Sequence, residues 1–153
     1  MSYKKIYHSY PEACTGCRVC EIICSLKHEK IGVNPKRSMI KILDIPEKGI
    51  FIPNTCQQCE DAPCIDVCPE DAISQDNQTG VIHVDEENCS GCKLCIDACK
   101  FDTIFLHPEK NIVQICYLCG GNPMCIKYCL QEAIVFLTPE EYEHKKNDKI
   151  KSK

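Results

Sequence analysis

Sixteen cysteines dominate the chemistry that this chain could perform. They fall into four groups of four, and each group opens with C-x2-C and closes with C-x3-C. The groups are Cys14, Cys17, Cys20 and Cys24; Cys56, Cys59, Cys64 and Cys68; Cys89, Cys92, Cys95 and Cys99; and Cys116, Cys119, Cys125 and Cys129. Only the gap between the second and third cysteine varies. Thiolates at this density indicate metal ligation, and the fourfold repeat indicates duplicated modules.

The spacing within a group distinguishes between kinds of metal centre. A structural zinc site holds one ion tetrahedrally, usually with two well-separated C-x2-C pairs. The run C-x2-C-x2-C in the first and third groups places three thiolates on one tight loop instead. Such a loop suits a cubane, and C-x2-C-x2-C-x3-C is the spacing of bacterial ferredoxins. We therefore expect four 4Fe-4S clusters, with a zinc-binding structural adaptor as a distant alternative.

The segments around the cysteines predict the elements that position them. In the last three groups the final cysteine is followed by three residues, a small residue and isoleucine, as in PEDAI. We expect a short helical turn that begins near this cysteine, and then a strand. Hairpins are predicted from residues 39–43 with 50–52 and from 72–74 with 81–84, because turn residues separate the two runs. A further strand is predicted at 134–137.

The C-terminal segment carries the pattern of a helix start. Thr138 suits the N-cap, Pro139 the first helical position and Glu141 the third. The predicted helix runs to about Asn147 and is charged on most faces. We interpret it as structural, with subunit docking as the alternative.

Composition and charge narrow the class of protein. The 153 residues allow one domain or two very small ones, and without the cysteines the apolar content is thin for a core, so bound inorganic centres are expected to hold the fold. The net charge of −4 argues against a nucleic-acid partner. No apolar signal region or twin arginine precedes Cys14, and no apolar run is long enough for a membrane span. We expect a cytoplasmic protein whose thiols bind metal and do not form disulfides.

The other polar residues do not form a recognisable catalytic site. The histidines lack paired ligand spacing and are expected on the surface or in strands; they are His8, His28, His83, His107 and His144. The acidic runs 85–87 and 140–143 do not resemble an acid–base pair, and no phosphate-binding loop or dinucleotide motif is present. We expect no catalytic residue in this chain.

Glycines and basic residues inside the motifs can each be interpreted as structural or as functional. Gly16 and Gly91 separate the first two cysteines of their groups, where glycine either brings backbone N–H groups close to cluster sulfur or simply permits a tight loop. Basic side chains in the motifs either tune cluster potentials or form ordinary solvated surface; they are Arg18, Lys93, Lys100 and Lys127.

The motifs resemble a known class of electron carrier. The segments PCIDVCPEDAI and NCSGCKLCIDACKFDTI resemble a bacterial two-cluster ferredoxin. Residues 10–137 as a whole resemble the polyferredoxin-like subunits of molybdenum and tungsten oxidoreductases, a family that includes the iron–sulfur subunit of dimethyl sulfoxide reductase. The segment CTGCRVCEIICSLKHEKIGVNPKRSMIKI looks most like the small subunits of tungsten aldehyde oxidoreductases and of tungsten-type benzoyl-CoA reductase.

The resemblance implies a fold and a domain organisation. The fold would be α+β, with duplicated ferredoxin-like modules of short helices and small antiparallel hairpins, little regular structure, and the clusters as core. One ferredoxin-like half would comprise residues 1–50 and 111–137, and the other would be the insert 51–110. Residues 138–153 would form the charged C-terminal helix and tail.

The resemblance also implies that the last cysteine of each group is exchanged with a partner group. Cluster one would be held by Cys14, Cys17, Cys20 and Cys129; cluster two by Cys56, Cys59, Cys64 and Cys99; cluster three by Cys89, Cys92, Cys95 and Cys68; and cluster four by Cys116, Cys119, Cys125 and Cys24.

The function implied is an electron-transfer iron–sulfur subunit without catalysis of its own. It would relay single electrons between a large subunit with a tungsten or molybdenum pterin, of the aldehyde oxidoreductase kind, and a ferredoxin or a further flavin- or NAD-dependent subunit. A free-standing polyferredoxin and the iron–sulfur subunit of a formate dehydrogenase or hydrogenase complex are alternatives.

Overall fold

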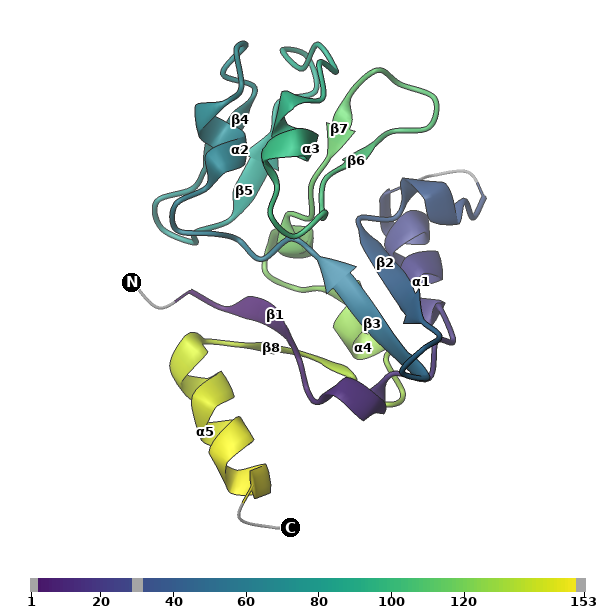
Figure 1. Cartoon of the computed structure of the whole chain (residues 1–153). Coiled ribbons are helices and arrows are strands. Elements are labelled where there is room, and N and C mark those ends of the chain that lie inside the picture. Colours follow the sequence, from purple (N-terminus) through teal and green to yellow (C-terminus); the bar gives the residue numbers. More distant parts are fainter. Residues whose placement is uncertain (1–2, 29–31, 151–153) are drawn as a thin grey trace.

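Short helices and two-stranded hairpins make up the computed structural model, which describes residues 3–28 and 32–150 (Figure 1). The helices are α1 (Val19–His28), α2 (Pro63–Asp66), α3 (Leu94–Ala98), α4 (Met124–Lys127) and α5 (Pro139–Ile150), with 3-10 turns η1 (Pro11–Ala13), η2 (Pro35–Arg37) and η3 (Leu118–Gly120). The strands are β1 (Lys5–His8), β2 (Ile40–Ile45), β3 (Ile50–Thr55), β4 (Ile73–Gln75), β5 (Ile82–Val84), β6 (Phe105–Leu106), β7 (Val113–Gln114) and β8 (Ile134–Leu137). This confirms the predicted mixture of short helices and small hairpins.

Within the described residues the strands pair antiparallel as β1–β8, β2–β3, β4–β5 and β6–β7. The two predicted hairpins are confirmed as β2–β3 and β4–β5, and the predicted strand 134–137 is β8. The Asp76 carboxylate stabilises the turn between β4 and β5, because it accepts hydrogen bonds from the backbone N–H groups of Gln78 and Thr79. The pair β1–β8 was not predicted, and it joins the first and last parts of the cysteine-containing region (Figure 1).

The short helices lie earlier in each group than predicted. In the last three groups the helix contains the third cysteine and ends before the fourth. The reason lies three residues after the fourth cysteine, where Asp71, Asp102 and Glu132 adopt φ values of 49°, 51° and 47°. This left-handed conformation turns the chain and does not continue a helix. The prediction of a helical turn that begins near the last thiol was therefore wrong.

Helix packing divides the elements into two sets. Helix α1 packs against α4, and α2 packs against α3. In Figure 1, α2, α3, β4 and β5 gather at one end of the molecule, whereas β1, β8 and α4 lie toward the other. The apolar core between these elements is built from isoleucines with cysteines among them; the most deeply buried apolar side chains are Ile6, Ile40, Ile82, Leu118 and Ile134. The cysteines are thus part of the core itself.

Helix α5 begins where the sequence predicts. Thr138 Oγ1 accepts a hydrogen bond from the Glu141 N–H, and the Glu141 carboxylate accepts one from the Thr138 N–H, which is a capping box. The helix continues to Ile150, three residues beyond the predicted end. It is held to the body through β8 and a stack of Tyr142 on Tyr7, whose ring centroids are 4.2 Å apart. None of the helices in residues 3–28 and 32–150 has the length and apolarity needed to span a membrane.

Candidate cluster-binding sites

The first cysteine set combines residues from both ends of the chain. Cys14, Cys17 and Cys20 line one small cavity together with Cys129, which follows α4. Cys20 lies in α1, and burial raises the pKa of its thiol to about 12. Burial also raises the pKa of Cys14, and the neighbouring Cys129 adds to that rise. Cys24 does not line this cavity, although it belongs to the same sequence group.

The second and third sets exchange their last cysteines. A cavity of about 400 Å³ is lined by four cysteines, three from one group and one from the next; they are Cys56, Cys59, Cys64 and Cys99. A smaller cavity is lined by Cys68, Cys89, Cys92 and Cys95. Helices α2 and α3, which carry Cys64 and Cys95, pack against each other between the two cavities.

The fourth set lies where α1 meets α4. Burial raises the pKa of Cys125, and the adjacent thiols of Cys116, Cys24 and Cys119 raise it further. Burial raises the pKa of Cys116 to about 11, while a hydrogen bond from the Thr55 side chain favours its thiolate. Cys24 therefore lies beside the fourth sequence group, and the sixteen candidate ligands fall into three cysteine-lined cavities and one group of interacting thiols.

Hydrogen-bond donors are directed at the sulfur atoms. Ala72 N donates to Cys68 Sγ and Ala133 N to Cys129 Sγ, both at 3.3 Å, and each donor follows directly after a left-handed residue. The corresponding position in the third group is Thr103, whose hydroxyl lies 3.4 Å from Cys99 Sγ.

In the first group, Met39 N, just before β2, donates to Cys24 Sγ at 3.3 Å. Donors of this kind stabilise thiolates and tune cluster potentials. The sulfur sets and their donors thus fit thiolate-ligated iron–sulfur clusters.

The four sets are also connected to one another. Burial raises the pKa of Cys95 to about 11 and that of Cys56 to about 12. Cys64 of the second set helps to raise the pKa of Cys95 in the third set. Cys116 of the fourth set helps to raise the pKa of Cys56 in the second set. Cys20 of the first set likewise acts on Cys125. These electrostatic interactions link set three to set two, set two to set four, and set four to set one.

A fully buried amide that the sequence motifs do not reveal lies between the second and fourth sets. Gln58 is only 2% exposed and lies between Cys56 and Cys59. Its Nε2 donates to the Cys116 carbonyl at 2.6 Å, and its Oε1 accepts from the Ile82 N–H at 2.7 Å. The side chain therefore ties the loop of one set to the loop of the other.

The spacing of the cysteine side chains can be compared with that of a single-ion site. Over residues 3–28 and 32–150, no three histidine, cysteine or acidic side chains are arranged to hold one ion. A cubane spreads its ligands more widely, because each thiolate binds a different iron atom.

The histidine predictions were wrong at one position. His107 is buried, and its Nδ1 accepts hydrogen bonds from the Glu109 and Lys110 N–H groups, so it closes the turn after β6. His83 and His144 are exposed as expected. His28 lies at the end of α1, where its Nδ1 is 3.1 Å from the hydroxyl of Tyr117. The basic residues within the motifs are exposed.

Cysteine-lined cavities, sulfur-directed N–H groups and small hairpins define a ferredoxin-like iron–sulfur protein of the electron-transport class. The chain belongs to the 4Fe-4S dicluster domain family, which matches residues 47–138. This match includes the last three cysteine groups. The zinc-adaptor alternative is not supported by this membership.

Curated relatives extend the match to most of the chain. The polyferredoxin-like subunit of an aliphatic sulfonate oxidoreductase from Pyrococcus furiosus is 44% identical over 119 residues, which covers 78% of this chain and 68% of that protein. The electron transport protein HydN of Escherichia coli is 32% identical over 152 residues, covering 85% and 86%. The uncharacterized ferredoxin-like protein YdhX of E. coli is 34% identical, but the chain spans only 60% of its length.

A solved structure shares the fold. The active site complex BamBC of benzoyl coenzyme A reductase, in complex with benzoyl-CoA, contains a chain that matches with a TM-score of 0.55 over 99% of this chain and 91% of that one. The sequence identity is 23%. At this identity the likeness concerns the fold alone.

Proposed function

We propose that this chain is the electron-transfer subunit of an oxidoreductase complex and holds four 4Fe-4S clusters. The observation that carries the proposal is the gathering of sixteen cysteines into four sets of four. Following the exchanged pairing that the resemblance implies, we assign one cluster to each set. When bound, each cluster would supply a centre that accepts and releases one electron.

The cysteines have a second role besides ligation, because the exchanged ones join neighbouring sets. Cys68 and Cys99 connect sets two and three, and Cys24 and Cys129 connect sets one and four. Gln58 links set two to set four through its bond to the Cys116 carbonyl. These links support two ferredoxin-like halves, residues 1–50 with 111–137 and residues 51–110, and a linear order of the four sites.

The partner we propose is a large catalytic subunit that contains a tungsten or molybdenum pterin, of the aldehyde oxidoreductase kind. The support comes from the sequence resemblance and from the P. furiosus relative, which is a subunit of an aliphatic sulfonate oxidoreductase. A ferredoxin or a further redox subunit would exchange electrons at the other end of the row. We further propose a cytoplasmic location, where cysteine thiols remain reduced.

Affinity purification from the native anaerobic host, followed by metal analysis and identification of what co-elutes, tests this function. We expect a large subunit with tungsten or molybdenum to co-elute in stoichiometric amount. If the chain elutes alone and reduces several unrelated enzymes, it is a free-standing carrier and the subunit proposal is wrong. A colourless protein that contains zinc would contradict the iron–sulfur assignment as well.

A further inference from the structure

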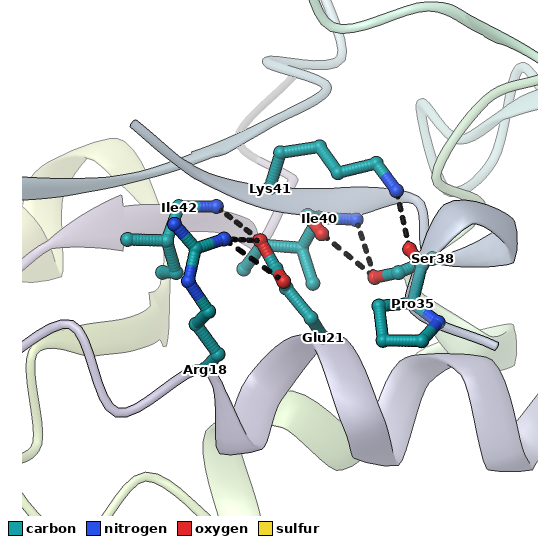
Figure 2. A network of polar contacts seen from close by, with 7 residues as sticks. All are labelled: Arg18, Glu21, Pro35, Ser38, Ile40, Lys41 and Ile42. Atoms are coloured by element: carbon teal, nitrogen blue, oxygen red, sulfur yellow. Dashed lines mark hydrogen bonds and ion pairs between the residues drawn. The ribbon is translucent and has the colours of Figure 1, made fainter. Parts of the chain in front are cut away.

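A buried carboxylate lies directly beside the first cysteine set. Glu21 follows Cys20 in α1 and is only 4% exposed. Figure 2 shows its side chain between α1 and strand β2, where Oε1 accepts a hydrogen bond from the Ile42 N–H at 2.6 Å. Arg18 Nη1 donates to both carboxylate oxygens, at 3.2 and 3.3 Å.

The two residues that bind this carboxylate also line the cavity of the first set. Arg18 and Ile42 surround that cavity together with the cysteines Cys14, Cys17, Cys20 and Cys129. Glu21 does not line the cavity itself, and its carboxylate is held directly behind these two wall residues. The Glu21 backbone N–H is a donor toward the Cys20 sulfur, while the Glu21 carboxylate charge acts electrostatically on the same thiol.

The positive charge of Arg18 offsets the negative charge of Glu21 only in part, because the two side chains differ in burial. The Arg18 side chain is 51% exposed, whereas that of Glu21 is 5% exposed. Water screens the guanidinium much more strongly than it screens the carboxylate, because the effective dielectric constant is far lower in the interior. Arg18 lines the cavity itself but is screened by water, so it offsets the buried charge of Glu21 only in part.

We propose that Glu21 is a positioning residue that sets the reduction potential of cluster one, lowering it by fixing a buried negative charge beside the Cys14–Cys20 loop. The inference rests on the proposed cluster at this set. One-electron reduction makes a cluster more negative by one charge and neither makes nor breaks a bond. A fixed negative charge nearby disfavours that step, and net charge is one of the factors that set cluster potentials.

The chain offers a matched control for the charge. Glu60 follows Cys59 as Glu21 follows Cys20, but its side chain is exposed. Glu60→Gln also removes one negative charge from the residue directly after a proposed ligand. At Glu60, however, that charge is exposed and screened by water. The two substitutions therefore separate the effect of burial from the effect of charge alone.

A redox titration followed by electron paramagnetic resonance on the iron-loaded full-length chain tests the inference. The cluster-one signal is the one lost in the Cys14→Ser variant, and an external one-electron reductant supplies the electrons. We expect Glu21→Gln to favour reduction of cluster one at least tenfold, which is about 59 mV for one electron. Glu60→Gln is expected to shift its neighbouring cluster much less, and Glu21→Asp, which keeps the charge, is expected to stay near the wild-type potential.

Each other outcome has a definite meaning. An unchanged or more negative potential in iron-loaded Glu21→Gln overturns this inference but leaves the proposed function intact. Loss of the cluster-one signal in Glu21→Gln, with its retention in Glu21→Asp, also overturns it, because the charge would then serve assembly. A wild-type chain without any cluster signal would overturn the proposed function and this inference together.

Discussion

Cys24 stands in the first sequence group but lies beside the fourth. Burial and hydrogen bonds from residues 38–40 act on this thiol, and among the other cysteines Cys119 acts on it electrostatically. We predict that Cys24→Ser damages cluster four while cluster one keeps its spectrum, because the first set retains Cys14, Cys17, Cys20 and Cys129. Magnetic resonance spectra of the variant measure this. An altered cluster one beside an intact cluster four would contradict the exchanged pairing.

The raised pKa values of the buried thiols predict how acid affects cluster retention. Burial raises the pKa of Cys20 and of Cys56 to about 12 from an ordinary 9.0, so these thiols are protonated in the metal-free folded chain near neutral pH. The ligands are thiolates when iron is bound, so loading releases protons and lower pH favours the metal-free form. Cluster loss to an iron chelator should therefore be faster at pH 6 than at pH 8. Equal rates would contradict this linkage.

At the scale of elements, the loop around Cys89 and Cys92 needs glycine at position 91 because a larger residue would clash with a neighbouring segment. Gly91 has φ +67°, and a Cβ there would lie 2.4 Å from the backbone oxygen of Asn111. Gly120 follows Cys119 with a similar φ of +68°, but no described atom outside its neighbours lies within 4 Å of a Cβ there.

We predict that Gly120→Ala destabilises the chain by about 1–2 kcal/mol through backbone strain, and that Gly91→Ala costs clearly more because the loop must also move. Anaerobic thermal unfolding of both variants compares them. Equal losses of stability would show that the contact with Asn111 is unimportant.

Helix α5 is attached to the body through β8 and through an aromatic stack. Tyr142 lies flat against Tyr7 of β1, and the exposed Lys4–Glu141 ion pair adds little. Tyr142→Ala should release the helix, so that its amides lose protection from hydrogen exchange while those of β2 and β3 keep theirs. The exposed His144 provides the control, because His144→Ala should leave the protection of α5 unchanged. Retained protection in Tyr142→Ala would place the attachment elsewhere.

The sequence predicts those elements whose signals are local. The hairpins 39–52 and 72–84 and the start of α5 follow from turn residues and a capping box, and the structure confirms them. The positions of the short helices could not be predicted in this way. They depend on Asp71, Asp102 and Glu132 adopting left-handed conformations, which no residue type at those positions requires.

In the candidate site, too, local sequence signals are predictable and contacts between distant segments are not. Cysteine spacing identifies all sixteen candidate ligands, whereas the contacts of Gln58 and Glu21 depend on segments far apart in sequence. Gln58 reaches Cys116 across 58 positions, and Glu21 reaches Ile42 across 21. No motif could show that Gln58 is buried between two cysteine sets or that Glu21 is buried beside the first.

For the whole molecule, the proposed row of cluster sets has an exposed cysteine at each end. Set one lies beside Leu130, which is 91% exposed, and includes the exposed Cys17. Set three at the opposite end includes the exposed Cys92, next to the half-exposed Leu94. Sets two and four lie between them and are joined by Gln58. Electron exchange with partners is therefore expected at sets one and three.

The central claim is that one chain holds four clusters, and iron and sulfide analysis of anaerobically purified protein tests it most directly. Four cubanes contain about sixteen iron and about sixteen sulfide ions per chain, with the broad brown absorbance of iron–sulfur centres. We predict this content in the wild-type protein. About eight iron per chain, or zinc in a colourless protein, would contradict the account.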